Sequence, residues 1–265
     1  MSSSHARVPA GVAALALAGC YWLTPYEDLL DGGPEAPDSG GLDARGDAND
    51  EASTGFCASI QPPPFFCADF DDGSLARWDT VNVRSPNLLA IVSDASVSPP
   101  SSLLASVPSD TTTADGVFVA RALDRASAVD VDFDVHLDAT DTATDVTFLA
   151  RLFLGGASAA LWAVPGRACV VETAPGADGG SFDVVTHVLD WTPRFGPTTE
   201  WVHVTMRLST DGDPSLRMTV NARTTEIPLE ARWTPGLGNL QLGFFQVNEP
   251  HGRTVRYDNV VVNLR

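Results

Sequence analysis

The run from Cys67 to Gly73, CADFDDG, places three carboxylates (Asp69, Asp71 and Asp72) directly after a cysteine. Carboxylates this close together can bind a hard cation such as calcium, which prefers six to eight oxygen ligands. They can also supply half of an acid/base pair. A third interpretation is the polar end of a strand that turns at Asp72-Gly73. The residues by themselves leave all three interpretations open.

A second row of acids lies between Asp130 and Asp138, where acidic and apolar residues alternate. Hydrolysis of a glycoside with retention needs two carboxylates about 5–5.5 Å apart. Residues on the same face of a strand stand about 6.5–7 Å apart, so this row does not converge on one bond or one ion. Aspartate is also one methylene shorter than glutamate. We therefore interpret the row as a solvated strand face and assign no catalytic residue.

A candidate sugar-binding platform comes from EWVHVTMRL, in which Trp201, His203 and Arg207 share one face of an alternating strand. If this strand lies beside the acidic row, His203 and Arg207 reach across to Asp132 or Asp134. Aromatic rings stack on pyranose C–H groups, and charged side chains bind hydroxyls, so these five residues are the predicted glycan site. Trp162 and Trp191 are further candidates for it. The competing interpretation is that tryptophan covers the core at a strand end.

The elements that must position these residues are strands. From Phe56 onward, short runs rich in Val, Leu, Phe and Thr alternate with turn clusters such as SPPSS, APGADGGS and STDGDPS. In the segments 130–138, 201–209 and 215–221, apolar and polar residues alternate with a period of two. No long amphipathic helix is predicted. Residues 56–265 therefore form an all-β domain, and its size favours a jelly-roll sandwich of two antiparallel sheets.

The first 55 residues have a different character. Residues 1–19 contain the apolar run VPAGVAALALAG, which is too short for a permanent membrane span. Leu17-Ala18-Gly19-Cys20 resembles the bacterial lipobox, which implies a signal peptide, lipidation of Cys20 and a stable membrane anchor. Tyr21 after the cysteine favours the outer membrane by the same resemblance. Residues 20–55 are predicted to be a disordered acidic tether.

Charge and cysteines narrow the function further. The chain has 34 acids and 16 bases, a net charge of −18, which argues against nucleic acid as a partner. An exported chain meets an oxidising environment. Of the three pairings open to Cys57, Cys67 and Cys169, the short loop makes Cys57–Cys67 the favoured disulfide, with a contribution of about 2–3 kcal/mol. Cys169 is then a small apolar core residue rather than a nucleophile.

Three segments resemble concanavalin A-like lectin and glucanase domains. CADFDDGSLARW resembles their opening strand, VRYDNVVVNLR their closing strand, and EWVHVTMRL with SLRMTVNA a hairpin between them. The resemblance covers about residues 60–265 and implies the jelly-roll fold. Glycosidases of this superfamily carry Glu-x-Asp-x-Glu on one strand, and this chain has none. The superfamily often holds a structural calcium, which implies a Ca²⁺ site made by Asp258 with Asp69 or Asp71.

Three functions remain at this point. The leading hypothesis is a noncatalytic glycan-binding module displayed on a cell-envelope lipoprotein. The alternatives are a polysaccharide hydrolase or lyase of the same superfamily, and a structural or adhesion protein without a small ligand. Fold alone does not decide between them.

Overall fold

The computed structural model describes residues 3–8, 55–84, 86–109, 116–138, 147–164, 167–176, 181–189, 200–244 and 252–265. Most of them form strands, and α1 (Phe56–Ser59) is a single helical turn. Within these ranges no helix is long and apolar enough to cross a membrane. Residues 9–54 lie outside the description, and with them Cys20 and the predicted tether. The predicted leader, anchor and tether therefore remain predictions.

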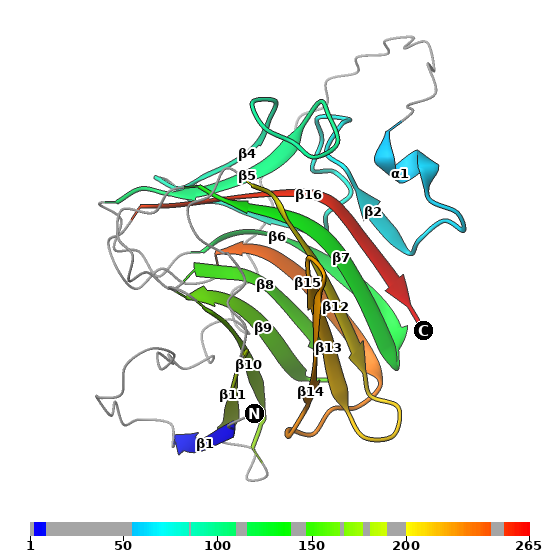
Figure 1. Cartoon of the computed structure of the whole chain (residues 1–265), viewed down its shortest axis with the longest axis vertical. Helices are drawn as coiled ribbons and strands as arrows, with labels where there is room; N and C mark the ends of the chain where they lie inside the picture. The colour runs from blue at the N-terminus through cyan, green and yellow to red at the C-terminus, as the bar shows by residue number, and fades with distance from the viewer. Residues whose placement is uncertain are drawn as a thin grey trace, which may run out of the picture.

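The strands form two antiparallel sheets that pack face to face (Figure 1). Alternation explains this directly: in β7, Val131, Phe133 and Val135 are almost fully buried, while the residues between them face outward. The all-β sandwich predicted from the sequence is confirmed.

Sheet A contains eight strands, and its central strands are β9, β8 and β15. Its first strand, β1, falls within the predicted leader and pairs with β11. In spatial order the strands are β1 (Ser3–Val8), β11 (Phe182–Val188), β10 (Arg167–Pro175), β9 (Ala157–Val164), β8 (Thr147–Leu154), β15 (Gly236–Phe244), β6 (Val117–Ala126) and β3 (Thr80–Asn82).

Sheet B has the closing strand of the chain near its middle, paired with β7 on one side and with β5 and β2 on the other. In spatial order its strands are β14 (Arg223–Pro228), β13 (Ser215–Val220), β12 (Val202–Ser209), β7 (Ala128–Leu137), β16 (Arg253–Leu264), β5 (Ser102–Val107) and β4 (Leu88–Val92), with β2 (Phe66–Ala68) against β16.

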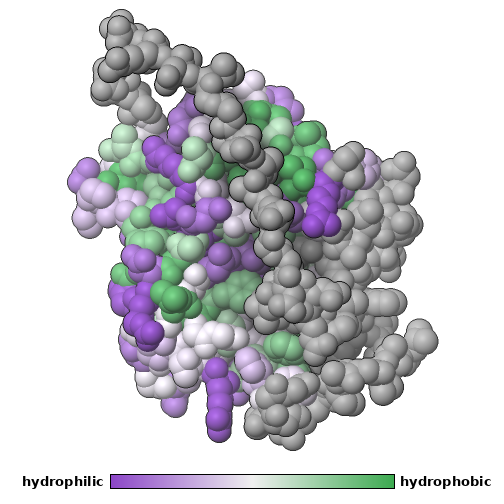
Figure 2. All heavy atoms as spheres, turned by 180° about the vertical axis from the view of Figure 1, so that it is seen from behind, coloured by the Kyte–Doolittle hydropathy of each residue, from purple (hydrophilic) through white to green (hydrophobic). Residues whose placement is uncertain are grey.

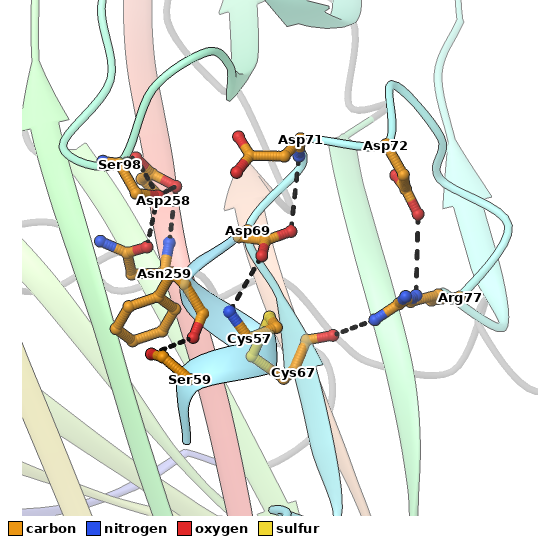
Figure 3. The surroundings of a disulfide bond; sticks show 11 residues. Cys57, Ser59, Cys67, Asp69, Asp71, Asp72, Arg77, Ser98, Asp258 and Asn259 are labelled. Atoms are coloured by element: carbon orange, nitrogen blue, oxygen red, sulfur yellow. Dashed lines mark hydrogen bonds and ion pairs between the residues drawn. A yellow bond between two sulfur atoms is a disulfide. The ribbon is translucent and has the colours of Figure 1, made fainter. Parts of the chain in front are cut away.

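The two ends of the domain meet, because β2 pairs with β16 in the register Cys67↔Val261. The predicted disulfide between Cys57 and Cys67 is present and ties α1 to β2 (Figure 3). Cys169 is a buried thiol outside this disulfide. Strand β2 ends at Ala68, and Phe70 adopts a left-handed φ of 60°. Asp69, Asp71 and Asp72 therefore all lie beyond the strand, in the bend and turn that follow it.

The outside of the sandwich is mixed in character. On the face opposite to that of Figure 1, hydrophilic and hydrophobic residues are interspersed (Figure 2). Among the described residues the large exposed hydrophobic side chains are Val81, Val83, Leu88, Val97 and Leu237. The exposed hydrophobic side chains of the described residues are therefore distributed over several strands and loops, and specific groups of side chains are better candidates for a binding site.

Candidate functional site

The platform predicted from the sequence lies on the outer face of sheet B. Strand β12 pairs with β7, as the prediction required, in the register His203↔Asp134. His203 Nδ1 lies 2.9 Å from Asp134 Oδ1, and His203 Nε2 lies 3.9 Å from Asp132 Oδ1. The hydrogen bond with Asp134 raises the pKa of His203 above its usual value. Three of the five predicted residues are therefore in contact with one another.

The other candidates do not join this group. Trp201 precedes β12, and its ring lies 5.5 Å from the ring of His136. Arg207 is exposed and stands opposite Asp130 in the register. Trp162 lies on sheet A, and Trp191 lies outside the described residues. Glycan binding by these residues remains a prediction.

The polar groups of the sheet B face already bind one another. Asp134 also accepts a hydrogen bond from Asn259 Nδ2 at 2.8 Å, and Asp132 accepts one from Thr205 at 2.6 Å. Further along the face, Arg256 pairs with Asp138 at 3.2 Å, and Arg265 pairs with Asp130 at 2.8 Å. A sugar would have to compete with these existing bonds, which favours a structural role for this face.

The predicted calcium ligands lie near one another but are occupied by hydrogen-bond donors (Figure 3). Asp258 accepts from the backbone N–H groups of Val97 at 2.7 Å and Ser98 at 2.9 Å. Asp69 accepts from the backbone N–H of Cys57 at 3.0 Å, and Asp71 accepts from that of Ser101 at 3.3 Å.

An N–H group cannot coordinate a cation, so these surroundings do not fit a Ca²⁺ ion. Among the described residues no group of three or more His, Cys, Asp or Glu side chains is placed to hold a metal. Asp258 is fully buried, and burial raises its pKa to about 6. The calcium site remains a prediction, and the hydrogen bonds instead indicate that Asp258 latches the loop of Val97 and Ser98 to β16.

A second group of polar residues, which the sequence did not point to, lies on the outer face of sheet A. In β8, β9, β10 and β15 every second residue belongs to the core, for example Leu152, Leu161, Val170 and Leu242. The residues between them face away from the core. These outward positions are Phe148, Arg151, Phe153, Ser158, Ala160, Trp162, Cys169, Val171, Thr173, Asn239, Gln241 and Gly243, and we call them the outer face of sheet A.

Arg151 is the cation at the centre of this face, and its neighbours hold it in place. Ser158 on β9 is 2% exposed, and its hydroxyl accepts hydrogen bonds from Arg151 Nε at 3.2 Å and Nη2 at 3.0 Å. The guanidinium carbon also lies 4.3 Å from the centre of the Phe153 ring. A hydrogen-bonded and stacked guanidinium has little rotational freedom left, so it is preorganised to bind a ligand.

Two amide side chains of β15 stand beside Arg151. Gln241 is opposite Arg151 in the register and Asn239 is opposite Phe153. Gln241 Oε1 and Asn239 Oδ1 are both buried, with no hydrogen-bond partner in the part of the chain that the structure describes. Buried polar atoms in native proteins are almost always hydrogen-bonded, so these two require water or a ligand.

The floor between these groups is built from small residues. Ala160 pairs with Arg151 on one side, and Ala120 of β6 pairs with Gln241 on the other. Gly243 has a φ of +120°, and a Cβ there would lie 2.4 Å from the carbonyl oxygen of Val117. The outward positions of β8, β9, β10 and β15 include no carboxylate. Among the outward positions named above, Arg151 is therefore the charged side chain.

Sequence reasoning missed this face because β8 and β15 are far apart along the chain. The available signal was a polar residue at an outward position of an otherwise apolar strand: Arg151 in TFLARLFL, and Asn239 and Gln241 in GLGNLQLGF. Each is ordinary when taken alone. They become a site only because the register places β8 next to β15.

Glu172 is the other polar residue that the sequence did not single out. It lies on the core side of β10, is 0% exposed, and has its Oε2 3.2 Å from His187 Nε2. Its carboxylate also accepts hydrogen bonds from the backbone N–H groups of Glu230 and Ala231 and from Trp233 Nε1. Burial by itself would raise the pKa of Glu172, but these hydrogen bonds together lower it. Glu172 therefore fixes the segment that passes from β14 in sheet B to β15 in sheet A.

Comparison with known proteins identifies solved structures that have a similar fold. No family model and no curated protein matches the chain. Among solved structures, an endo-β-1,4-glucuronan lyase from the fungus Trichoderma reesei matches 76% of this chain and 96% of its own, at 15% identity and a TM-score of 0.60. A cellulose-induced protein matches 74% of this chain and 96% of its own, at 13% identity and a TM-score of 0.52.

The domain has a jelly-roll sandwich fold like that of the glucuronan lyase. An alginate lyase from Pseudomonas aeruginosa also resembles it, at 14% identity over 69% of this chain and 88% of its own, with a TM-score of 0.46. At such identities the likeness concerns the fold alone. The activities of these proteins do not transfer to this chain through the fold, so its function has to be argued from its own residues.

Proposed function

We propose that this protein binds a polysaccharide that carries carboxylate groups, and that it does so on the outer face of sheet A. The observation that carries the proposal is the convergence of Arg151 with the amides of Asn239 and Gln241, whose oxygen atoms are buried without partners. A planar guanidinium has five N–H donors in a geometry that matches a carboxylate such as that of a uronate, and in Arg151 the Nε and Nη2 groups also donate to Ser158. The amides suit neighbouring sugar hydroxyls.

The distribution of charge supports an acidic ligand in spite of the acidic chain. The acids of β7 lie on the opposite sheet, where Arg, His, Thr and Asn side chains pair with them. At separations beyond about 8–10 Å, physiological salt screens most of the repulsion between such charges and a bound ligand. The local interaction with Arg151 then decides which sign of charge binds.

A second candidate is cleavage of the same polysaccharide by β-elimination. The glucuronan lyase that shares the fold at a TM-score of 0.60 supports this candidate over a purely noncatalytic module. In this reaction a base removes the proton beside the uronate carboxylate, the bond from the adjacent carbon to the glycosidic oxygen breaks, a carbon–carbon double bond forms, and an acid protonates the leaving oxygen. Arg151 and the amides suit the step in which the carboxylate charge is stabilised.

The acid and base for such a reaction are not evident on this face. Its outward positions on β8, β9, β10 and β15 include neither tyrosine nor histidine, and Tyr257 is buried in the core. The lyase candidate is tested by the ultraviolet absorbance of the new double bond when wild-type protein is incubated with glucuronan or alginate. A preparation that binds the polysaccharide without any rise in this absorbance would contradict the lyase candidate.

Binding is tested by comparing two arginine variants, one on each sheet. Wild-type protein should bind glucuronan or alginate in isothermal titration calorimetry and should bind neutral cellulose oligosaccharides less well. Arg151→Ala should weaken binding about 10- to 100-fold, because a hydrogen bond to a charged group contributes about 1.5–3 kcal/mol. Arg207→Ala is the matched control on the face predicted from the sequence, and it should bind like wild type.

If Arg207→Ala weakens binding and Arg151→Ala does not, the site lies on sheet B, at the platform predicted from the sequence. Binding that is insensitive to both substitutions would contradict both faces. No binding to any polysaccharide of a broad panel would leave the structural or adhesion protein as the remaining interpretation.

We also propose that the domain works at the cell envelope. A lipid on Cys20 would anchor it there, and the membrane that we propose is the outer membrane. The lipobox-like run Leu17-Ala18-Gly19-Cys20 supports this proposal. Cys20→Ser should move the protein from the membrane fraction to the soluble fraction, because two or more acyl chains are needed for stable anchoring. Ser53→Ala, also before the domain, serves as a control. An unchanged distribution of Cys20→Ser would contradict the anchor.

A further inference from the structure

The outer face of sheet A contains a third buried polar atom without a partner, the indole Nε1 of Trp162. Trp162 lies on β9, opposite Cys169 on β10 and Phe148 on β8. Its ring meets that of Phe148 edge to face, with centroids 5.1 Å apart. An indole N–H normally finds a hydrogen-bond acceptor when it is buried. Here the acceptor is missing among the described protein groups.

The position of Trp162 relative to Arg151 follows from the register. Ala160 pairs with Arg151, and Trp162 is two residues further along the same strand, on the same face. Two residues along a strand correspond to about 6.6 Å. A bulge between Phe148 and Ala150 lets Phe148 remain opposite Trp162 while Arg151 remains opposite Ala160. The aromatic pair therefore occupies the row next to the arginine.

We propose that Trp162 and Phe148 form a second sugar subsite beside Arg151. It takes the pyranose unit that adjoins the bound uronate in the same polysaccharide. The indole N–H donates a hydrogen bond to a hydroxyl or ring oxygen of this unit, and the indole ring contacts its C–H groups. Phe148 is 7% exposed and orients the indole through the edge-to-face contact. This subsite rests on the proposed function, and it adds that the protein recognises at least two consecutive units of a chain.

The test uses conservative variants of the full chain with glucuronan or alginate as the probe. Trp162→Phe keeps an aromatic ring and removes the N–H donor. It should weaken binding about fivefold, the factor that corresponds to one ordinary hydrogen bond of about 1 kcal/mol. It should also remove the change in tryptophan fluorescence that the polysaccharide causes in wild type. Trp201→Phe on sheet B is the matched control and should retain both affinity and fluorescence change.

Phe148→Leu is a second variant in case Trp162→Phe does not fold. It keeps the indole of Trp162 but removes the edge-to-face contact that orients it, so binding should weaken. If Trp162→Phe and Phe148→Leu fold and bind like wild type while Arg151→Ala still weakens binding, the subsite is wrong and the proposed function stands. If wild type binds neither polysaccharide, both are wrong.

Discussion

Replacement of Glu172 by alanine is expected to lower the free energy of unfolding by about 3–5 kcal/mol, because each buried donor left without its acceptor costs about 1–3 kcal/mol. Glu172 is 0% exposed and pairs with His187, which is itself buried. The substitution also leaves the N–H groups of Glu230, Ala231 and Trp233 without the acceptor that they share. Chemical denaturation followed by circular dichroism measures the loss.

The matched control is Glu226→Ala. Glu226 pairs with Arg217 at 2.9 Å, but both side chains are more than half exposed. Exposed pairs of this kind contribute about 0–1 kcal/mol, so the control should unfold almost like wild type. Equal effects of the two substitutions would show that Glu172 does not hold the crossing segment.

The stability contributed by Glu172 should depend on pH in a defined direction. Its pKa is lowered in the folded state from the ordinary 4.5. The contribution is therefore fully present above that ordinary value and is lost as the pH falls through the lower, folded pKa. Glu172→Gln should show a flatter stability profile in this acidic range.

Replacement of Asp258 by alanine is expected to cost about 2–3 kcal/mol. The carboxylate accepts hydrogen bonds from the backbone N–H groups of Val97, Ser98 and Asn259. Each buried donor left without a partner costs about 1–3 kcal/mol, and part of this is regained because Asp258 no longer has to be desolvated. Thermal unfolding and hydrogen exchange of the Val97 and Ser98 amides measure the effect.

Asp72→Ala is the control for this substitution. Asp72 is about half exposed, lies 3.7 Å from Arg77, and should contribute less than about 1 kcal/mol. If Asp258→Ala lowers the free energy of unfolding as little as this control does, the hydrogen bonds of Asp258 do not hold the loop of Val97 and Ser98. Added calcium should leave the melting temperature of wild type unchanged if the N–H donors saturate Asp258. A calcium-dependent rise that Asp258→Ala abolishes would instead establish the calcium site predicted from the sequence.

The pH dependence of Asp258 runs opposite to that of Glu172. Burial raises the pKa of Asp258 from 3.8 to about 6, so the folded state binds more protons than the unfolded state between these values. The contribution of this group to stability therefore falls as the pH rises from about 4 to about 6, and it is constant above that range. The two buried carboxylates differ because the donors around Glu172 outweigh its burial, whereas those around Asp258 do not.

The sequence alone determined the class of fold. Alternation in segments such as 130–138 and 201–209 has a period of two, and only a sheet with one buried face satisfies it. The same pattern put His203 and the acids of β7 on outward faces of their strands, and the structure makes these strands neighbours. The Cys57–Cys67 disulfide followed from the short separation of the two cysteines.

The tertiary structure decided which polar residues remain available for a ligand. Asp132, Asp134 and His203 look like a site in the sequence, yet strand pairing makes them partners of one another and of Thr205 and Asn259. Glu172 sits at a position where alternation predicts an apolar side chain, and its partners come from the crossing segment and from His187 on β11. Such pairings join residues that are distant along the chain, and no local pattern encodes them.

The position of the proposed site shows the same division. Local sequence sets the direction of each side chain, so it places Arg151, Asn239 and Gln241 on the outward side of their strands. The neighbour of each strand is instead set by how all the strands together bury their apolar faces, which is a property of the whole domain. The sequence by itself therefore determined the sandwich. Only the folded chain brought the guanidinium, the two amides and the indole of Trp162 onto one face.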